Sequence, residues 1–211
     1  MIAKAHSRKN RSRKKTAGSH DNGGEVRIIG GQWGSRKVGF PGATGLRPTG
    51  DRIRETLFNW LQNEIVGARC LDLFAGSGIL GIEALSRGAE SCTFVETHEP
   101  TYQSLAQQLS KFEADQPKTQ LVREDAIKWL QSVDPLPLYN MVFVDPPFAL
   151  NIASQCCELL ENSGLLMGDA LIYLEVARSQ SELDLPANWL QLRSKSSGQV
   201  SYFLYRREAP D

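Results

Sequence analysis

Residues 71–81 read LDLFAGSGILG, and this stretch decides the fold. An apolar strand runs into a glycine-rich turn that opens a helix, with Gly76, Gly78 and Gly81 at GxGxxG spacing. Glycines at these places let the backbone approach a ligand and direct the first amides of the helix toward it. The spacing by itself suits a nicotinamide dinucleotide as well as S-adenosylmethionine, and tight turns in α/β proteins also use glycine without any ligand.

From residue 70 onward, apolar strands alternate with amphipathic helices, which is typical of a doubly wound α/β sheet. The expected strands are 70–74, 91–96, 119–122, 141–144, 170–176, 191–194 and 200–206. The expected helices are 78–87, 99–112, 126–131 and 152–162. The last two strands, joined across Ser196-Ser197-Gly198, are expected to form an antiparallel hairpin.

A smaller β extension is expected upstream of this sheet. Short strands over 26–29 and 36–40 and a loop over 41–48 lead to a helix that begins near Asp51, with Thr49 or Asp51 as its cap. The sequence therefore predicts one main domain, 25–211, whose hairpin and first helix occupy 25–66.

The first residues of the chain form a basic tail, 1–24, that should be disordered. Seven of the 24 Lys and Arg residues fall within the first 15 positions, where no acid occurs, and the remainder carries a formal charge of about −7. Such a tail can bind phosphates by counterion release, although a solvated, dispensable extension has the same composition.

Composition excludes several classes of protein. No apolar run approaches the roughly 20 residues that span a bilayer, and no secretory signal is visible, so we expect a soluble, cytoplasmic protein. The four cysteines lack CxxC spacing and the chain has three histidines, so we expect no metal site and buried, reduced thiols.

Acids follow the second and third strands of the expected sheet. Glu96 lies 20 residues after Gly76, where a carboxylate can accept hydrogen bonds from two ribose hydroxyls. Asp125 follows the third strand and can accept from an adenine amino group, but it can equally cap the next helix. Neither position separates a nicotinamide cofactor from S-adenosylmethionine.

The decisive feature is the tetrapeptide Asp145-Pro146-Pro147-Phe148 at the carboxyl end of the fourth strand, where open α/β sheets place ligands. An amino group on an aromatic base is a poor nucleophile because its lone pair is delocalised. The Asp145 carboxylate and the Pro146 carbonyl can accept its two N–H groups and direct the lone pair at a methyl sulfonium. Phe148 offers a face for an extruded base. A plain turn is the structural alternative.

This tetrapeptide resembles the [Asp/Asn/Ser]-Pro-Pro-[Phe/Tyr] motif of class I amino-methyltransferases. A closer resemblance, carried by 26–31, 46–49, 51–61, 72–81, 142–148 and 198–200, is to the bacterial RsmD family, whose members methylate guanine N2 in 16S ribosomal RNA. The resemblance extends from Val26 to Arg207 and leaves the basic tail outside it.

The resemblance implies a Rossmann-like class I methyltransferase fold, with a mostly parallel seven-stranded sheet, and S-adenosylmethionine as cofactor with S-adenosylhomocysteine as product. It implies that Gly76 and Gly78 line the methionine portion, that Glu96 holds the ribose, and that Asp125 with Ala126 holds the adenine. Residues 145–148 would hold the guanine. The cofactor residues expected on this basis are Asp72, Phe74, Ala75, Gly76, Ser77, Gly78, Glu96, Asp125, Ala126, Thr49 and Arg52.

The expected activity is methylation of one guanine N2 amine in 16S rRNA, within a small-subunit assembly particle, by a monomeric enzyme. One alternative is an adenine-N6 methyltransferase of DNA or RNA, although 211 residues leave no obvious DNA-recognition domain. A dehydrogenase would leave the tetrapeptide unexplained. A non-catalytic RNA-binding assembly factor is the alternative from another class, and affinity for S-adenosylmethionine would separate it from an enzyme.

Overall fold

The central feature of the molecule is a seven-stranded sheet in the order β5-β4-β3-β6-β7-β9-β8. The computed structural model describes residues 23–42, 49–112, 119–135, 138–180 and 182–209. Its strands are β3 (Arg69–Asp72), β4 (Ser91–Val95), β5 (Thr119–Val122), β6 (Tyr139–Val144), β7 (Leu166–Ala177), β8 (Trp189–Ser197) and β9 (Val200–Arg207). The pairs among β5, β4, β3, β6 and β7 are parallel, and β9 pairs antiparallel with both β7 and β8. The doubly wound α/β fold with a C-terminal hairpin is confirmed.

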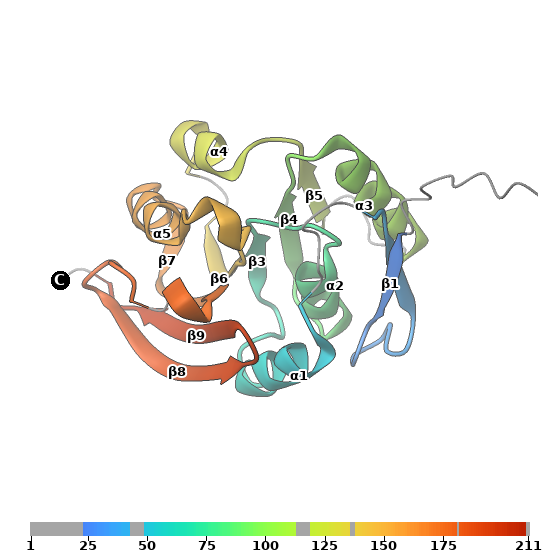
Figure 1. Cartoon of the computed structure of the whole chain (residues 1–211), viewed down its shortest axis with the longest axis horizontal. Coiled ribbons are helices and arrows are strands. Elements are labelled where there is room, and N and C mark those ends of the chain that lie inside the picture. Colours follow the sequence, from blue (N-terminus) through green and yellow to red (C-terminus); the bar gives the residue numbers. More distant parts are fainter. Residues whose placement is uncertain (1–22, 43–48, 113–118, 136–137, 181, 210–211) are drawn as a thin grey trace, which may run out of the picture.

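Helices cover both faces of this sheet, as Figure 1 shows. One apolar core packs α1 (Asp51–Trp60), α2 (Ile79–Ser86) and α3 (Glu99–Lys111) on one face. A second core packs α4 (Ala126–Ser132) and α5 (Ala153–Asn162) on the other. Most positions of β3 and β6 are buried on both faces of the sheet, which explains why adjacent residues, as in MVFV of β6, are apolar.

The N-terminal extension is a two-stranded antiparallel hairpin of β1 (Gly24–Arg27) and β2 (Lys37–Phe40) beside α3 (Figure 1). The expected bounds of β1, 26–29, were wrong. The strand ends at Arg27 because the N–H groups of Ile29 and Gly30 donate to the Glu83 carboxylate instead of to a strand. The predicted tail and most of the predicted loop lie outside the described residues.

The cap predicted for α1 was also wrong. Gly50 is the N-cap, its carbonyl accepts from Ile53 N–H at 2.9 Å, and no side chain caps the helix. The two expected caps have other partners. The Thr49 hydroxyl donates to Asp145 at 3.1 Å, and Asp51 pairs with Arg54 at 2.7 Å.

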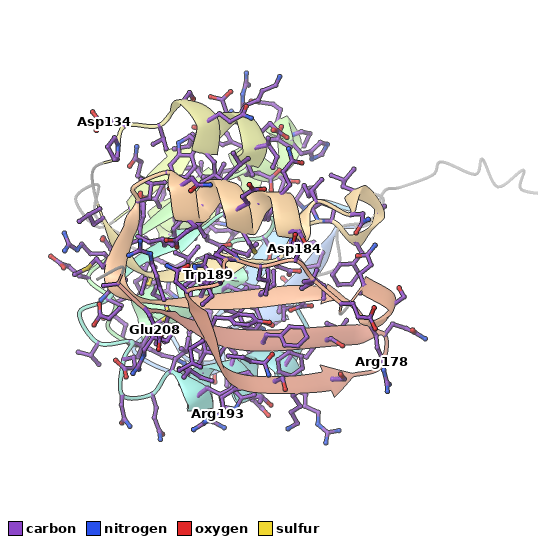
Figure 2. All side chains as sticks on the ribbon, turned by 90° about the vertical axis from the view of Figure 1, so that its left-hand side faces the viewer. Asp134, Arg178, Asp184, Trp189, Arg193 and Glu208 are labelled. Atoms are coloured by element: carbon purple, nitrogen blue, oxygen red, sulfur yellow. The ribbon has the colours of Figure 1, made fainter. Side chains whose placement is uncertain are left out.

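The C-terminal hairpin is anchored to α5 at the sheet edge shown in Figure 2, where Trp189 lies beneath that helix. Trp189 Nε1 donates to Glu161 at 2.8 Å, and Arg207 Nη2 donates to the same carboxylate at 2.8 Å. These bonds fix β8 and β9 against α5. Both β7 and β8 are longer than the sequence predicted.

The four cysteines are buried and free, as expected for structural thiols, and burial raises their pKa values. The described ranges contain no helix long and apolar enough to cross a membrane. They also contain no group of three or more His, Cys, Asp and Glu side chains arranged to hold a metal ion.

Candidate active site

Acidic side chains collect at the carboxyl ends of the parallel strands. Asp72 ends β3 and is in register with Phe94 of β4 and Phe143 of β6, so Glu96 and Asp145 each lie two residues further along adjacent strands. The charges of Glu96 and Asp72 interact, and so do those of Asp72 and Asp145. The structure therefore brings these three sequence-predicted site residues to one edge of the sheet.

The glycine loop is a tight turn between β3 and α2. Ala75 N–H donates to Val95 O at 2.9 Å, which ties the loop to β4, and Gly78 N–H donates to Ala75 O at 2.6 Å. Gly78 is the N-cap of α2 with φ of 73°, and a Cβ there would lie 2.3 Å from Leu105 Cδ1. Glycine is therefore required at position 78 by both conformation and space.

The loop residues around Gly76 differ in their exposure to solvent. Ala75 and Ser77 are buried, whereas Phe74 and Gly76 are partly exposed. Phe74 packs against the core under α4 and α5. The exposed part of the loop is thus backbone around Gly76, which is the kind of surface that a ligand can approach closely.

Glu96 is held by two backbone amides. Its Oε2 accepts from Gly76 N–H at 2.9 Å and its Oε1 accepts from His98 N–H at 2.7 Å. Each carboxylate oxygen can accept more than one hydrogen bond, so both retain capacity for the hydroxyls of a ribose. These two hydrogen bonds therefore fix the orientation of the carboxylate, and its contact with a ribose stays a prediction.

Asp72 has a structural function that its sequence position did not reveal. It is 2% exposed, and its Oδ2 accepts from Gly81 N–H at 3.0 Å, which fastens the first turn of α2 to the end of β3. Burial raises the pKa of Asp72 to about 7, the Gly81 hydrogen bond opposes that rise, and the charge of Glu96 adds to it. Contact between Asp72 and a cofactor stays a prediction.

The tetrapeptide leaves β6 directly and turns into a short 3-10 helix, η1 (Phe148–Leu150). Among the described residues nothing donates to the Pro146 carbonyl, whereas the Pro147 carbonyl accepts from Leu150 N–H at 3.0 Å. Gln180, which lies just after β7 in the chain, donates from Nε2 to Phe148 O at 3.2 Å. This bond links η1 to the end of β7. The described residues therefore leave the Pro146 carbonyl, which is predicted from the sequence to accept from a substrate amine, without a donor.

Asp145 is partly buried, and its Oδ2 accepts from the Thr49 hydroxyl at 3.1 Å. Burial raises the pKa of Asp145 well above its ordinary value, the charge of Glu175 raises it further, and the Thr49 hydrogen bond opposes both. Thr49 was predicted to contact the cofactor; its hydroxyl donates to Asp145, and contact with a cofactor stays a prediction.

A buried arginine fixes Thr49 in this position. The side chain of Arg54 is 0% exposed; its Nε donates to Thr49 O at 3.1 Å and its Nη1 to Glu83 Oε2 at 3.3 Å. This ion pair was not predicted from the sequence. The available signal was that Arg54 shares a helical face with Leu57, Phe58 and Leu61, while Glu83 interrupts the apolar helix ILGIEALS.

The remaining predicted residues lie at the edge of the site. Asp125 is the N-cap of α4 and accepts from Lys128 N–H at 3.1 Å, so its capping role is confirmed while its contact with adenine stays a prediction. Ala126 is buried behind it. Arg52 is exposed on the first turn of α1, and none of the described residues pairs with its guanidinium.

Comparison with known proteins gives consistent results. A family model described as conserved hypothetical protein 95 matches residues 26–206. The chain is 47% identical over 192 residues to ribosomal RNA small subunit methyltransferase D of Escherichia coli (strain K12), which covers 90% of this chain and 94% of the relative. The protein of that name from Haemophilus influenzae is 43% identical, over 87% of this chain and 94% of the relative.

A solved structure also relates this chain to methyltransferases. The structure described as putative methyltransferase yhhF from Escherichia coli has a TM-score of 0.80 at 45% identity and covers 89% of this chain and 100% of its own. The fold is therefore that of a methyltransferase, as the resemblance implied. The matched residues include the glycine loop and the tetrapeptide, and the chain belongs to the family of conserved hypothetical protein 95, the RsmD family.

Proposed function

We propose that this chain methylates the exocyclic N2 amine of a guanine in 16S rRNA, with S-adenosylmethionine as the methyl donor. Relatives named for methylation of small-subunit ribosomal RNA support an rRNA substrate. The observation that carries the chemistry is the pair of hydrogen-bond acceptors, Asp145 and the Pro146 carbonyl, at the carboxyl edge of the sheet beside the glycine loop.

The residues at this edge fit S-adenosylmethionine. Glu96 presents pre-oriented carboxylate oxygens for a diol, Gly76 offers exposed backbone, and Asp125 lies at the end of the strand beyond Glu96. When bound, the donor supplies an electrophilic methyl group on a sulfonium. The protein therefore has to supply orientation and has no need to activate the methyl group.

The tetrapeptide would supply that orientation. Asp145 Oδ1 and the Pro146 carbonyl can each accept one N–H of the amine, which turns the nitrogen lone pair toward the methyl group. Asp145 is also placed to take the proton that the amine loses once the new N–C bond has formed. The partly exposed ring of Phe148 can stack on the extruded base.

The experiment is methyl transfer from labelled S-adenosylmethionine to small-subunit RNA and particles from cells that lack this protein. Nucleoside analysis of the product should give N2-methylguanosine. N6-methyladenosine would overturn the proposed base, and absence of label from both naked RNA and particles would overturn the enzymatic function. The Asp145→Ala protein is the control for a contaminating methyltransferase.

A further inference from the structure

An apolar, uncharged segment lies exposed directly after Asp145 and Pro146. Residues 147–150, with the sequence PFAL, are all apolar; Phe148 is partly exposed, and the other three are exposed. No charged residue occurs from 146 to 157. One exposed apolar side chain is ordinary on a protein surface, but four in succession are unfavourable in water unless they contact a partner. The proposed function uses the side chain of Phe148, and it leaves the exposed remainder of the segment without a role.

Leu150 is the most notable member of this segment, because a leucine side chain is large and this one is 58% exposed. Among the described residues, the other exposed large hydrophobic side chains are Val66, at 76%, and Leu190, at 52%. Val66 precedes β3 and Leu190 lies at the start of β8, so both are at the sheet edge opposite to Asp145. Within the described ranges, Leu150 is therefore the exposed large hydrophobic residue of the carboxyl edge.

The backbone holds Leu150 in a fixed turn. Its N–H donates to Pro147 O at 3.0 Å within η1. The Phe148 carbonyl accepts from Asn151 N–H at 3.4 Å and from Gln180 Nε2 at 3.2 Å. Asn151 then ends the turn in the left-handed region, with φ of 50°. A side chain on so constrained a backbone loses little conformational freedom when it contacts a partner.

The dimensions of η1 match those of stacked bases. A 3-10 helix has three residues per turn and rises about 2 Å per residue, so Phe148 and Leu150 project about 120° apart and about 4 Å apart along its axis. Neighbouring bases of a stacked strand lie about 3.4 Å apart. While Phe148 contacts one base, Leu150 can therefore reach the position of the adjacent base. The lack of charge in the segment also favours bases over phosphates, which are contacted by charged and polar groups.

We propose that Leu150 is a wedge that enters the RNA strand at the place where the target guanine leaves the stack. This inference rests on the proposed function. A base within a stack cannot enter an active site, so its amine reaches Asp145 only after extrusion, which leaves a gap between the flanking bases. Proteins that unstack bases frequently fill such a gap with an apolar side chain. The contact of Leu150 with the flanking bases exists only in the extruded state, and it therefore favours that state.

Cross-linking tests the position of the wedge. All four native cysteines are buried, so Leu150→Cys supplies an exposed thiol for a maleimide photo-crosslinker. With S-adenosylhomocysteine present and small-subunit particles as the probe, primer extension should map the cross-link to nucleotides that flank the guanine methylated by the wild type. Leu190→Cys, at the opposite edge of the sheet, should give no cross-link there. Absence of the flanking cross-link, or cross-links of Leu150→Cys to a ribosomal protein or to distant RNA, would overturn the wedge.

Single-turnover methyl transfer with saturating enzyme tests the role in extrusion. Leu150→Ala should lower the rate about tenfold with unchanged affinity for S-adenosylmethionine, because less apolar surface fills the gap. Leu150→Met, which is similar in volume, should recover most of the rate, and Leu190→Ala should match the wild type.

Two outcomes of this experiment would contradict the wedge while the proposed function stands. One is a saturated rate in Leu150→Ala equal to that of the wild type. The other is a weaker affinity for RNA with that rate unchanged, which would indicate a docking contact. A wild type that transfers no methyl group would refute the proposed function, and the wedge with it.

Discussion

Two groups of buried carboxylates in this molecule are built in opposite ways. Glu83, 0% exposed, accepts from the backbone N–H groups of Ile29 and Gly30 and pairs with both Arg54 and Arg87. Each carboxylate oxygen of Glu83 therefore accepts two hydrogen bonds, one from a backbone amide and one from an arginine. Such a fully satisfied buried ion cluster fixes structure, here the β1 hairpin, α1 and α2.

The carboxylates at the end of the sheet have few partners. Among the described residues, Asp145 accepts a hydrogen bond from Thr49 alone, and its pKa is raised by burial and by the charge of Glu175. The protein thus retains an acid in an unfavourable environment, which is the usual condition of a residue kept for reaction and not for stability. Arg54 connects the two groups, since it bonds to Glu83 and to the backbone of Thr49.

The strongest test of this contrast is Asp145→Ala. Loss of the acceptor should reduce methyl transfer roughly 10⁴-fold, because both amine alignment and proton acceptance depend on it. Affinity for S-adenosylmethionine, measured by calorimetry, should stay largely intact, and so should the free energy of unfolding. Equal loss of cofactor binding and turnover would contradict the assigned role.

The matched substitution in the other group is Glu83→Ala. It removes the buried partner of Arg54 and leaves that guanidinium, among the described residues, only the exposed Asp51 as an acidic partner, so the free energy of unfolding should fall by about 3–5 kcal/mol. Urea denaturation measures the change, with the exposed Glu90→Ala as the control. A loss no larger than that of the control would show that the cluster does not stabilise the fold.

A smaller effect is expected at Glu96. Replacement by Gln keeps the shape but removes the charge from its hydrogen bonds, so affinity for S-adenosylmethionine should fall about tenfold to a hundredfold. Calorimetry on the wild type, Glu96→Gln and the distant Glu90→Gln gives the comparison. If Glu96→Gln binds as tightly as Glu90→Gln, the ribose is held elsewhere.

The smallest effect concerns pH and Asp72. Burial raises its folded pKa from 3.8 to about 7, so the folded state favours the protonated form. Its contribution to stability is therefore fully present below about pH 4 and is lost as the pH rises through about 7. The stability that Asp72→Asn loses relative to the wild type should therefore be larger below about pH 4 than above about pH 7. A stability difference between the two proteins that does not change with pH would contradict the raised pKa.

Much of the fold was predictable because it depends on local patterns. Apolar runs such as VFV before Asp145 and the glycine turn after β3 specify strands and their ends within a few residues. Parallel strands bring their carboxyl ends to one edge, so the meeting of Asp72, Glu96 and Asp145 also followed from the pattern. The family resemblance was confirmed for the same reason, since its motifs lie in these segments.

The wrong predictions depended on long-range contacts. By local chemistry Thr49 is a natural helix cap, but its hydroxyl donates to an acid 96 positions away. The β1 strand ends early because the amides of Ile29 and Gly30 donate to Glu83, which is 54 positions from Ile29. Local sequence carries no information on such partners, although an acid or arginine within an apolar run, as at Glu175 and Arg54, indicates that a partner exists.

A crystal structure of this protein with S-adenosylhomocysteine is the most direct test of the site. We expect the ribose hydroxyls to lie within hydrogen-bond distance of Glu96, and the sulfur to face Asp145 and Pro146 across the Gly76 loop. A ligand bound away from this edge, or a sulfur turned from the tetrapeptide, would contradict the proposal that the carboxyl end of the sheet is the methyl-transfer site.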